Sequence, residues 1–239
     1  MGMYLPSRSD HVIVDVGANV GDTAASMLDS CVHNFLCVEE HAPFFDMLCS
    51  NVKKQLMAPD RFILVNEVVG TGDFVGNLKA NESTAHIEVE PCGRPVRSLD
   101  SIVAEHQLLD KVALLKIDTD GFDGDVLLSS TQIINRSEPL IYWENQFCDD
   151  KQLNLLERAY EHLSKNGYNH LWIFDNFGNL LLEECTFAAL HSLNRYVAAQ
   201  DGHDCTRTIY YTDVLASKDN YQKAAAEAIS RYKCDVIAD

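Results

Sequence analysis

The segment Asp15–Gly21, with the sequence DVGANVG, constrains the fold more than any other part of the chain. It overlaps the end of the β-branched run His11–Val16 and directly precedes the helical segment Asp22–Ser30. Glycines between a strand and a helix let the backbone turn sharply, so that amide groups and the helix N-terminus face a ligand across the strand ends. The segment therefore predicts a ligand-binding loop at the end of the first strand.

Strands and helices alternate through the first 145 residues. After the first strand, buried strands are predicted at 34–38, 61–65, 111–117 and 140–143, with helices at 22–30, 42–55, 98–106 and 123–135. A half-exposed strand is predicted at Ile87–Glu90 as a decoration. This order predicts an α/β fold with a mostly parallel sheet, helices on both faces and ligands at the carboxyl ends of the strands.

The remainder of the chain completes the same domain. A hairpin (171–174 and 180–183) and a strand at 208–215 are expected, with helices at 151–165, 187–199 and 219–232. No linker, repeat or low-complexity tract divides the 239 residues. We expect a single domain, in which residues 1–145 bind a cofactor and residues 146–239 complete the sheet and the acceptor site.

Composition restricts the partners and the compartment. Nineteen Lys and Arg against 36 Asp and Glu give a formal charge of -17, which disfavours a phosphate backbone, so nucleic acid is not expected as a partner. No apolar run is long enough to span a membrane, and no signal peptide is apparent. The eight cysteines contain no C-x-x-C pair and are expected to be free thiols of a cytoplasmic protein.

The spacing within the loop distinguishes between cofactors. A dinucleotide fold uses G-x-G-x-x-G, but Asn19 stands at the second glycine position, where its side chain would crowd a diphosphate. S-adenosylmethionine has no diphosphate. Glu39 lies 22 residues after Gly17 at the end of the second strand, where a carboxylate can accept both ribose hydroxyls. A nicotinamide dehydrogenase remains an alternative, as does a non-catalytic nucleoside-binding protein.

Acidic residues follow the fourth and fifth strands. Asp118 and Asp120 are expected to point toward the cofactor cleft, whereas Asp123 and Asp125 could cap the next helix. Oxygen ligands from Asp118, Glu144 and Asn145 could also hold a Mg or Ca ion. The competing interpretation is that Glu144 bonds a substrate hydroxyl or a backbone amide.

Five segments in this order resemble the FkbM family of class I S-adenosylmethionine-dependent methyltransferases. They are VIVDVGANVGDTA, FLCVEEHAPFFDMLCSNV, SLDSIV, LLKIDTDGFDGDVL and LIYWEN, and together they cover about Val12 to Asn145. The resemblance implies a Rossmann-like fold with a seven-stranded sheet. It also implies methyl transfer to a hydroxyl of a sugar, a glycan or a related small molecule.

The resemblance further assigns roles to single residues. It implies that Glu39 holds the ribose, that Asp118 lies beside the reacting methyl group, and that the methionine part is bound by the loop residues Asp15, Gly17, Ala18, Asn19 and Gly21. Where the family commonly has D-x-E-G-x-E, this chain has Asp in place of both glutamates, at positions 120 and 123. Glu40 replaces the usual Pro. The first change puts a borrowed acceptor assignment in doubt.

Transfer to an alcohol needs a group that removes or polarises its proton. Asp118, Asp120 and Glu144 are the candidates, in that order, and an N-methyltransferase is the alternative within the class. His170 is a further candidate base, with His41 and His11 behind it. Trp143 and Trp172 could stack on a sugar ring, although aromatic residues in strands are more often part of the core.

Overall fold

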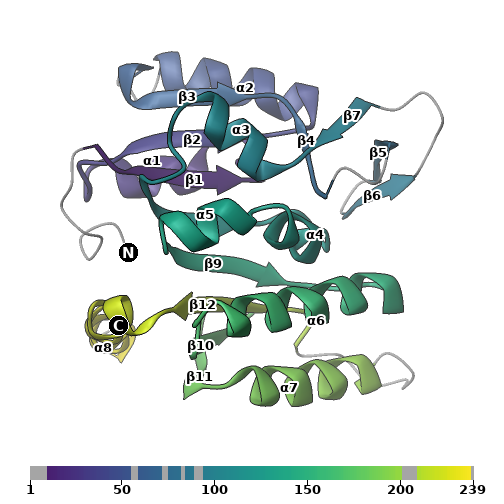
Figure 1. The fold of residues 1–239 in the computed structure, drawn as a ribbon, viewed down its shortest axis with the longest axis vertical. Helices are drawn as coiled ribbons and strands as arrows, with labels where there is room; N and C mark the ends of the chain where they lie inside the picture. Colours follow the sequence, from purple (N-terminus) through teal and green to yellow (C-terminus); the bar gives the residue numbers. More distant parts are fainter. Residues whose placement is uncertain are drawn as a thin grey trace.

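A computed structural model describes residues 10–54, 59–71, 75–81, 84–88, 94–200 and 209–237. For residues 75–81, 84–88 and 234–237 it describes the backbone alone. Within these residues a large central sheet is covered by helices on both faces (Figure 1).

The central sheet has eight strands in the order β11-β10-β12-β9-β8-β1-β2-β3. Their bounds are β1 Val12–Val16, β2 Asn34–Val38, β3 Phe62–Val65, β8 Val112–Ile117, β9 Leu140–Asn145, β10 His170–Asp175, β11 Leu180–Cys185 and β12 Thr212–Ser217. Strands β3, β2, β1, β8 and β9 are parallel, and β12, β10 and β11 join through antiparallel pairs. The predicted α/β class is confirmed. The sheet has one strand more than the predicted seven, because β11 folds back from β10 and extends the edge.

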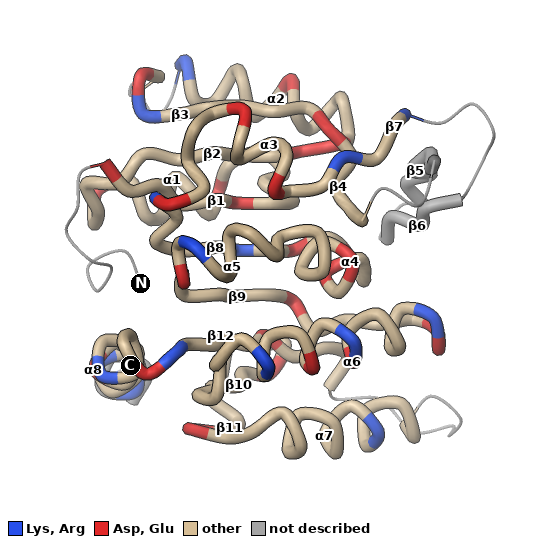
Figure 2. Tube along the Cα trace, viewed as in Figure 1, with Lys and Arg blue, Asp and Glu red and all other residues tan. Residues whose placement is uncertain are grey.

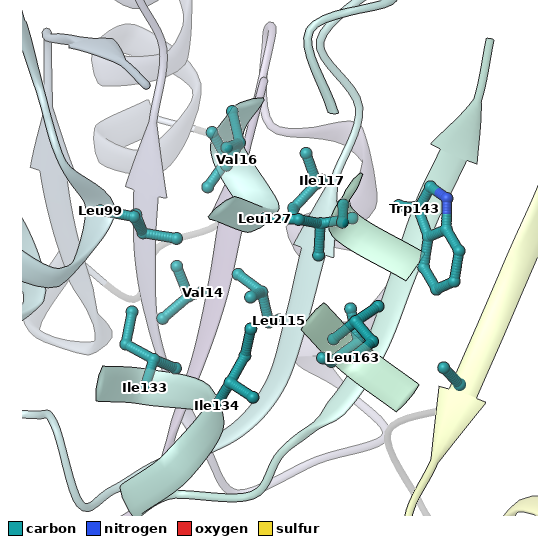
Figure 3. Packing of buried hydrophobic residues seen from close by; sticks show 14 of the residues in the cluster. Val14, Val16, Leu99, Leu115, Ile117, Leu127, Ile133, Ile134, Trp143 and Leu163 are labelled. Carbon is teal, nitrogen blue, oxygen red and sulfur yellow. The ribbon is translucent and has the colours of Figure 1, made fainter. Parts of the chain in front are cut away.

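The two faces of the sheet carry separate sets of helices. Helices α1 (Asp22–Leu28), α2 (Ala42–Lys54) and α8 (Asp219–Ile237) contribute to one apolar cluster. The other cluster contains residues of α3 (Leu99–Glu105), α4 (Asp123–Leu128), α5 (Thr131–Arg136), α6 (Asp150–Lys165) and α7 (Phe187–Ala199). Figure 3 shows this second cluster, in which Val14, Leu115 and Trp143 of the sheet pack near Ile134 and Leu163. Strands covered on both faces need continuous apolar runs, which the sequence supplies.

A smaller sheet lies beside the central one, in the order β4-β7-β5-β6 (Figure 1). Its strands are β4 (Val68–Val69), β5 (Val75–Asn81), β6 (Thr84–Glu88) and β7 (Arg94–Arg97), and a short 3-10 turn, η2 (Pro59–Arg61), precedes β3. The strand predicted at Ile87–Glu90 overlaps the end of β6, and residues 89 and 90 lie outside the described part of the chain.

The single helix predicted at 123–135 is two helices, α4 and α5, separated at Ser129 and Ser130. Both serine hydroxyls donate to carbonyls three residues earlier, and such bonds compete with helix continuation. Asp100 of α3 then accepts from the amides of Gln132 and Ile133, at 2.8 and 3.0 Å. A carboxylate supplied by another helix therefore starts α5, which explains why the local pattern did not predict the break.

Two further predictions concern the chain as a whole. Disulfide bonds are absent from the five cysteines whose side chains are described, which are Cys31, Cys37, Cys49, Cys148 and Cys185. The side chains of Cys92, Cys205 and Cys234 lie outside the described part. None of the helices in the described ranges combines the length and the apolar character needed to cross a lipid bilayer.

Candidate active site

A cleft of about 200 Å³ opens at the carboxyl ends of β1, β2 and β8. Its wall is formed by side chains and backbone within residues 17–23, 39–44 and 116–120. This is the edge at which parallel α/β sheets bind ligands. Figure 2 shows acidic positions at this edge, where β2 and β9 end and in α4. The cleft itself is lined by the carboxylates of Asp22, Glu39, Glu40, Asp118 and Asp120.

The glycine loop after β1 depends on left-handed backbone conformations. Gly17, Asn19 and Gly21 have φ values of 74°, 48° and 91°. A Cβ atom on Gly17 would lie 1.8 Å from the carbonyl oxygen of Asp118, so the loop backbone packs directly against the end of β8. A Cβ atom on Gly21 would lie 2.7 Å from Cδ1 of Leu48. Glycine is therefore required at position 17 by both conformation and space.

Glu39 connects the ends of β1 and β2. The residue is 4% exposed, and its two carboxylate oxygens accept from the backbone amides of Asn19 and His41, each at 2.8 Å. Burial raises the pKa of Glu39, while the two amides and Lys116 oppose this increase. Each oxygen has a second lone pair, so the carboxylate can accept further hydrogen bonds from a ligand in the cleft.

Lys116 is a buried cation in the floor of the cleft. Its Nζ atom lies 3.1 Å from Oδ1 of Asp15 and 3.2 Å from Oδ2 of Asp118, and it donates to the carbonyl of Gly17 at 3.3 Å. Burial lowers the pKa of Lys116, but the two carboxylates outweigh burial and hold the pKa above its ordinary value. The ammonium therefore stays charged at neutral pH.

A second group of acids lies beyond β8, toward β9 and β12. Glu144 is directly opposite Asp213 in the antiparallel pair of β9 and β12, so both side chains are on one face of the sheet. Burial first, and then Asp118 and Asp123, raise the pKa of Glu144 to about 9. Burial likewise raises the pKa of Asp123 to about 7 and that of Asp213 to about 6. Oε2 of Glu144 is buried and has no hydrogen-bond partner among the described residues, whereas Thr119 and the backbone of Gly121 oppose the increase in the pKa of Asp123.

Comparison with protein families gives a match to the methyltransferase FkbM domain over residues 15–169. The chain belongs to the FkbM methyltransferase family.

Three solved structures that are similar to this FkbM chain are distant from it in sequence. A methyltransferase FkbM from Methylobacillus flagellatus KT is 16% identical, with a TM-score of 0.48, over 65% of this chain and 37% of that one. An O-methyltransferase from Bacillus cereus in complex with SAH is 11% identical, with a TM-score of 0.49, over 88% and 75% of the two chains. A precorrin-6y C5,15-methyltransferase from Geobacter metallireducens GS-15 is 13% identical, with a TM-score of 0.46, over 90% and 83%. The chain thus spans little more than a third of the FkbM structure.

No curated protein matches this FkbM chain. None of the comparisons supports the predicted exclusion of nucleic acid as a partner, so that exclusion rests on the net charge alone.

The cofactor residues predicted for the FkbM chain are divided between the cleft wall and the core behind it. Gly17, Asn19, Glu39 and Asp118 line the cleft. The other three predicted residues, Asp15, Ala18 and Gly21, are buried and lie outside the cleft lining. Asp15 is 0% exposed and reaches the site only through its ion pair with Lys116.

The predicted cation site of Asp118, Glu144 and Asn145 does not form from these residues. Successive side chains of a strand face opposite sides of a sheet, so Asn145 points away from Glu144. Its amide donates to Oδ1 of Asn194 at 2.7 Å and to Oγ1 of Thr212 at 2.9 Å, and its oxygen accepts from the hydroxyl of Tyr160. In the part of the chain that the structure describes, no group of three or more His, Cys, Asp or Glu is placed to hold a metal ion.

Asp125 does not cap α4 as predicted. Its carboxylate accepts from the amide and the hydroxyl of Thr71, at 3.1 and 2.9 Å, and so anchors the segment after β4. Residue Phe122 precedes α4, and no side chain caps that helix. Asp123 is completely buried at its first turn. The helix is therefore joined to the smaller sheet at this end.

The aromatic and histidine candidates have mostly structural positions. Trp143 and Trp172 are both 0% exposed, which rules out stacking on a substrate. His170 begins β10 and lies at the end of the sheet opposite the carboxyl ends that form the cleft. Its Nε2 atom is 2.8 Å from Oδ1 of Asp219. His41 does line the cleft, with its ring centroid 4.6 Å from that of Phe44.

The sequence reasoning missed Lys116 and Asp213. A signal for Lys116 was present, because a single lysine interrupts an otherwise apolar strand two residues before Asp118, and period 2 places both on one face. Asp213 carries no such signal, since its position depends on β12 inserting between β9 and β10.

Proposed function

We propose that this chain is an S-adenosylmethionine-dependent methyltransferase that transfers the methyl group to a hydroxyl of a sugar, a glycan or a related small molecule. The observation that carries the proposal is one cleft that places Glu39 and Asp118 at the ends of β2 and β8, on two sides of the glycine loop. Family membership supports methyl transfer. The hydroxyl acceptor is inferred from chemistry and from the family resemblance.

The residues present fit this cofactor. Glu39 is already fixed by two amides and keeps lone pairs for the ribose hydroxyls. Asp118 has a side chain that is 48% exposed, and it can place negative charge beside a sulfonium. The five carboxylates that line the cleft favour a cationic ligand over a phosphate-bearing one, which argues against the nicotinamide dehydrogenase alternative. When bound, the cofactor would supply a methyl group on a positively charged sulfur, and the carbon–sulfur bond would break as the bond to the acceptor oxygen formed.

The chain's own residues position the acceptor, stabilise charge and remove the hydroxyl proton. The acceptor oxygen must be held about 3 Å from the methyl carbon with water excluded. Asp118 is held by Lys116, so it is suited to an electrostatic role. Asp120 lines the cleft with a φ of 50°, and burial and Asp118 raise its pKa. A carboxylate with a raised pKa is the better base, so Asp120 removes the hydroxyl proton as the new bond forms.

Glu144 has a different role in this scheme. With a pKa of about 9 it is protonated at neutral pH, so it donates a hydrogen bond rather than accepting a proton. The residue is only partly buried, and it lies opposite Asp213 and close enough to Asp118 for the two charges to interact. Glu144 therefore orients the acceptor, and it ranks behind Asp120 as a base.

The Asp120→Asn variant tests the catalytic assignment. We expect turnover to fall about a thousandfold, because general-base catalysis contributes roughly 10²–10⁴-fold, whereas adenosylhomocysteine affinity stays within threefold. Activity is measured with labelled cofactor in a screen of sugar nucleotides and glycans, and affinity is measured by calorimetry. Unchanged turnover would remove Asp120 from the mechanism, and wild-type protein that fails to bind adenosylhomocysteine would refute the proposed function.

Transfer to an amine is a second candidate, because the carboxylates of Asp118 and Asp120 together would favour a cationic acceptor. Among the described residues that line the cleft, Lys116 is the only Lys or Arg near Asp118 and Asp120. Glu144 and Asp213 lie on the neighbouring strands β9 and β12. An ammonium would supply the missing positive charge and would need only deprotonation. Adding amino sugars and small primary amines to the same screen separates the two acceptors.

A further inference from the structure

Lys116 is an unusual residue for its position. All six residues of β8 are buried, and Lys116 is 7% exposed at the fifth position of the strand. Burying an ammonium costs several kcal/mol before its partners compensate, and an apolar residue of similar volume is often no less stable. Stability alone therefore gives a weak reason for a lysine here.

The contacts of Lys116 join three separate parts of the site. Its Nζ atom pairs with Asp15 at the end of β1, bonds the carbonyl of Gly17 in the loop, and pairs with Asp118 after β8. Asp15 is completely buried, so its charge needs a cation. Asp118 is about half exposed, and water would solvate its charge without help. The Asp118 contact therefore fixes the direction of a carboxylate rather than neutralising it.

We propose that Lys116 is a positioning residue that sets the orientation of the Asp118 carboxylate and holds the glycine loop against the end of β8. This inference rests on the proposed function, because its purpose is to keep the cofactor cleft in its binding geometry before the ligand arrives. Lys116 acts through Asp118 and Gly17, and it does not need to touch the reacting atoms. Organisation of this kind lowers the cost of ordering the loop when a ligand binds.

The rival explanation is that Lys116 only neutralises Asp15. The double variant Asp15→Asn, Lys116→Met separates the two, because it removes the buried negative charge together with the buried positive one. If neutralisation were the whole role, this variant would fold and bind like the wild type. Under the proposal it folds with a similar melting temperature but binds adenosylhomocysteine at least about tenfold more weakly, the value of one hydrogen bond to a charged group.

Adenosylhomocysteine is the suitable probe because its thioether is neutral. Loss of Lys116 leaves the charge of Asp118 without its neighbouring cation, which would alter the affinity of a sulfonium by simple attraction, whereas a ligand without the sulfonium charge reports the geometry of the loop. Amide hydrogen exchange in residues 17–22 gives a second readout. We expect exchange there to accelerate in the double variant, while exchange in α6 is unchanged. A residue with a merely structural role would not confine its effect to the loop.

Two further variants keep the test decisive. Lys116→Arg retains the charge and can reach both carboxylates, so it should preserve affinity within about threefold. Asp118→Asn, introduced into the double variant, should add little to the loss, because residues that act through one contact are not additive. Wild-type affinity in the double variant, or full additivity with Asp118→Asn, would overturn the role of Lys116. Failure of the wild type to bind adenosylhomocysteine would instead overturn the proposed function.

Discussion

Two groups of acids differ in how their charges are stabilised. Glu39 and Asp118 form the cofactor side, and Glu144 and Asp213 form the acceptor side. At the ends of β2 and β8, Glu39 accepts hydrogen bonds from two backbone amides and Asp118 is paired with Lys116. On the β9 and β12 side, Glu144 has a buried oxygen that no residue in the described part of the chain bonds, and burial raises the pKa values of both Glu144 and Asp213. The cofactor side is thus organised in advance, whereas on the acceptor side one oxygen of Glu144 is bonded by none of the described residues.

This difference indicates where the protein's specificity lies. The fold itself supplies the backbone amides and the lysine that hold the acids of the cofactor side, so these acids are already oriented when a ligand binds. A buried carboxyl oxygen such as Oε2 of Glu144, which none of the described residues bonds, is costly, and a group that bonds it recovers part of that cost. We therefore expect the cofactor side to respond to substitution through geometry and the acceptor side to respond through pH.

The largest effect is expected from Gly17→Ala, which disturbs the backbone of the glycine loop on the cofactor side. The added Cβ would lie 1.8 Å from the carbonyl oxygen of Asp118, at a φ of 74°, so both a clash and left-handed strain oppose folding. We expect the free energy of unfolding to fall by about 4 kcal/mol or more, measured by urea denaturation.

Gly178→Ala is the matched control, because Gly178 has a similar φ of 84° but its nearest neighbour, the hydroxyl of Tyr232, would be 3.4 Å from the added Cβ. Only the backbone strain remains there, with a cost of about 1 kcal/mol. Equal losses in the two variants would show that the loop does not pack against β8 as described.

The next largest effect is expected from Glu39→Gln, which replaces the carboxylate of the cofactor side by an amide of similar size. An amide has one oxygen and one NH2 group, so it cannot accept from both Asn19 and His41 and also serve the ribose. We expect adenosylhomocysteine affinity to fall about a hundredfold, equivalent to roughly 2.7 kcal/mol, by calorimetry.

Glu40→Gln is the neighbouring control. Glu40 also lines the cleft, but burial and Glu39 raise its pKa to about 7, so it is partly protonated at neutral pH. We expect less than a threefold change in affinity for this variant. A loss as large as that of Glu39→Gln would mean that overall charge, rather than the ribose carboxylate, controls binding.

The sequence predicted the cofactor side better than the acceptor side. Asp15–Gly21 and Glu39 are set by local order, strand then loop then helix, so their arrival at one edge follows from the parallel sheet. The acceptor side depends on the insertion of β12 between β9 and β10, which no local pattern encodes, and Asp213 was missed for that reason. The misplaced cation site has a simpler cause. Glu144 and Asn145 are consecutive in a strand, and alternation alone should have separated them.

The smallest effect, and the one that tests the acceptor side, is the pH dependence of stability. The pKa of Glu144 is about 9 in the folded protein, above the ordinary value of 4.5, so the folded state binds more protons than the unfolded state between these pH values. The stability associated with protonated Glu144 is fully present below about pH 4.5 and is lost as pH rises through 9. Asp123 and Asp213, with pKa values of about 7 and 6, contribute in the same direction at lower pH.

The free energy of unfolding should therefore decline from pH 6 to pH 9. Glu144→Gln mimics the protonated acid, so it should reduce the slope of this decline by about 1 kcal/mol per pH unit and leave the stability at pH 5 nearly unchanged. Asp110→Asn is a control, because Arg136 lowers the pKa of this exposed carboxylate by a hydrogen bond, and its titration lies below this window. A decline that persists unchanged in Glu144→Gln would mean that Glu144 is ionised and has a partner. The acceptor side would then not differ from the cofactor side in how its charges are stabilised.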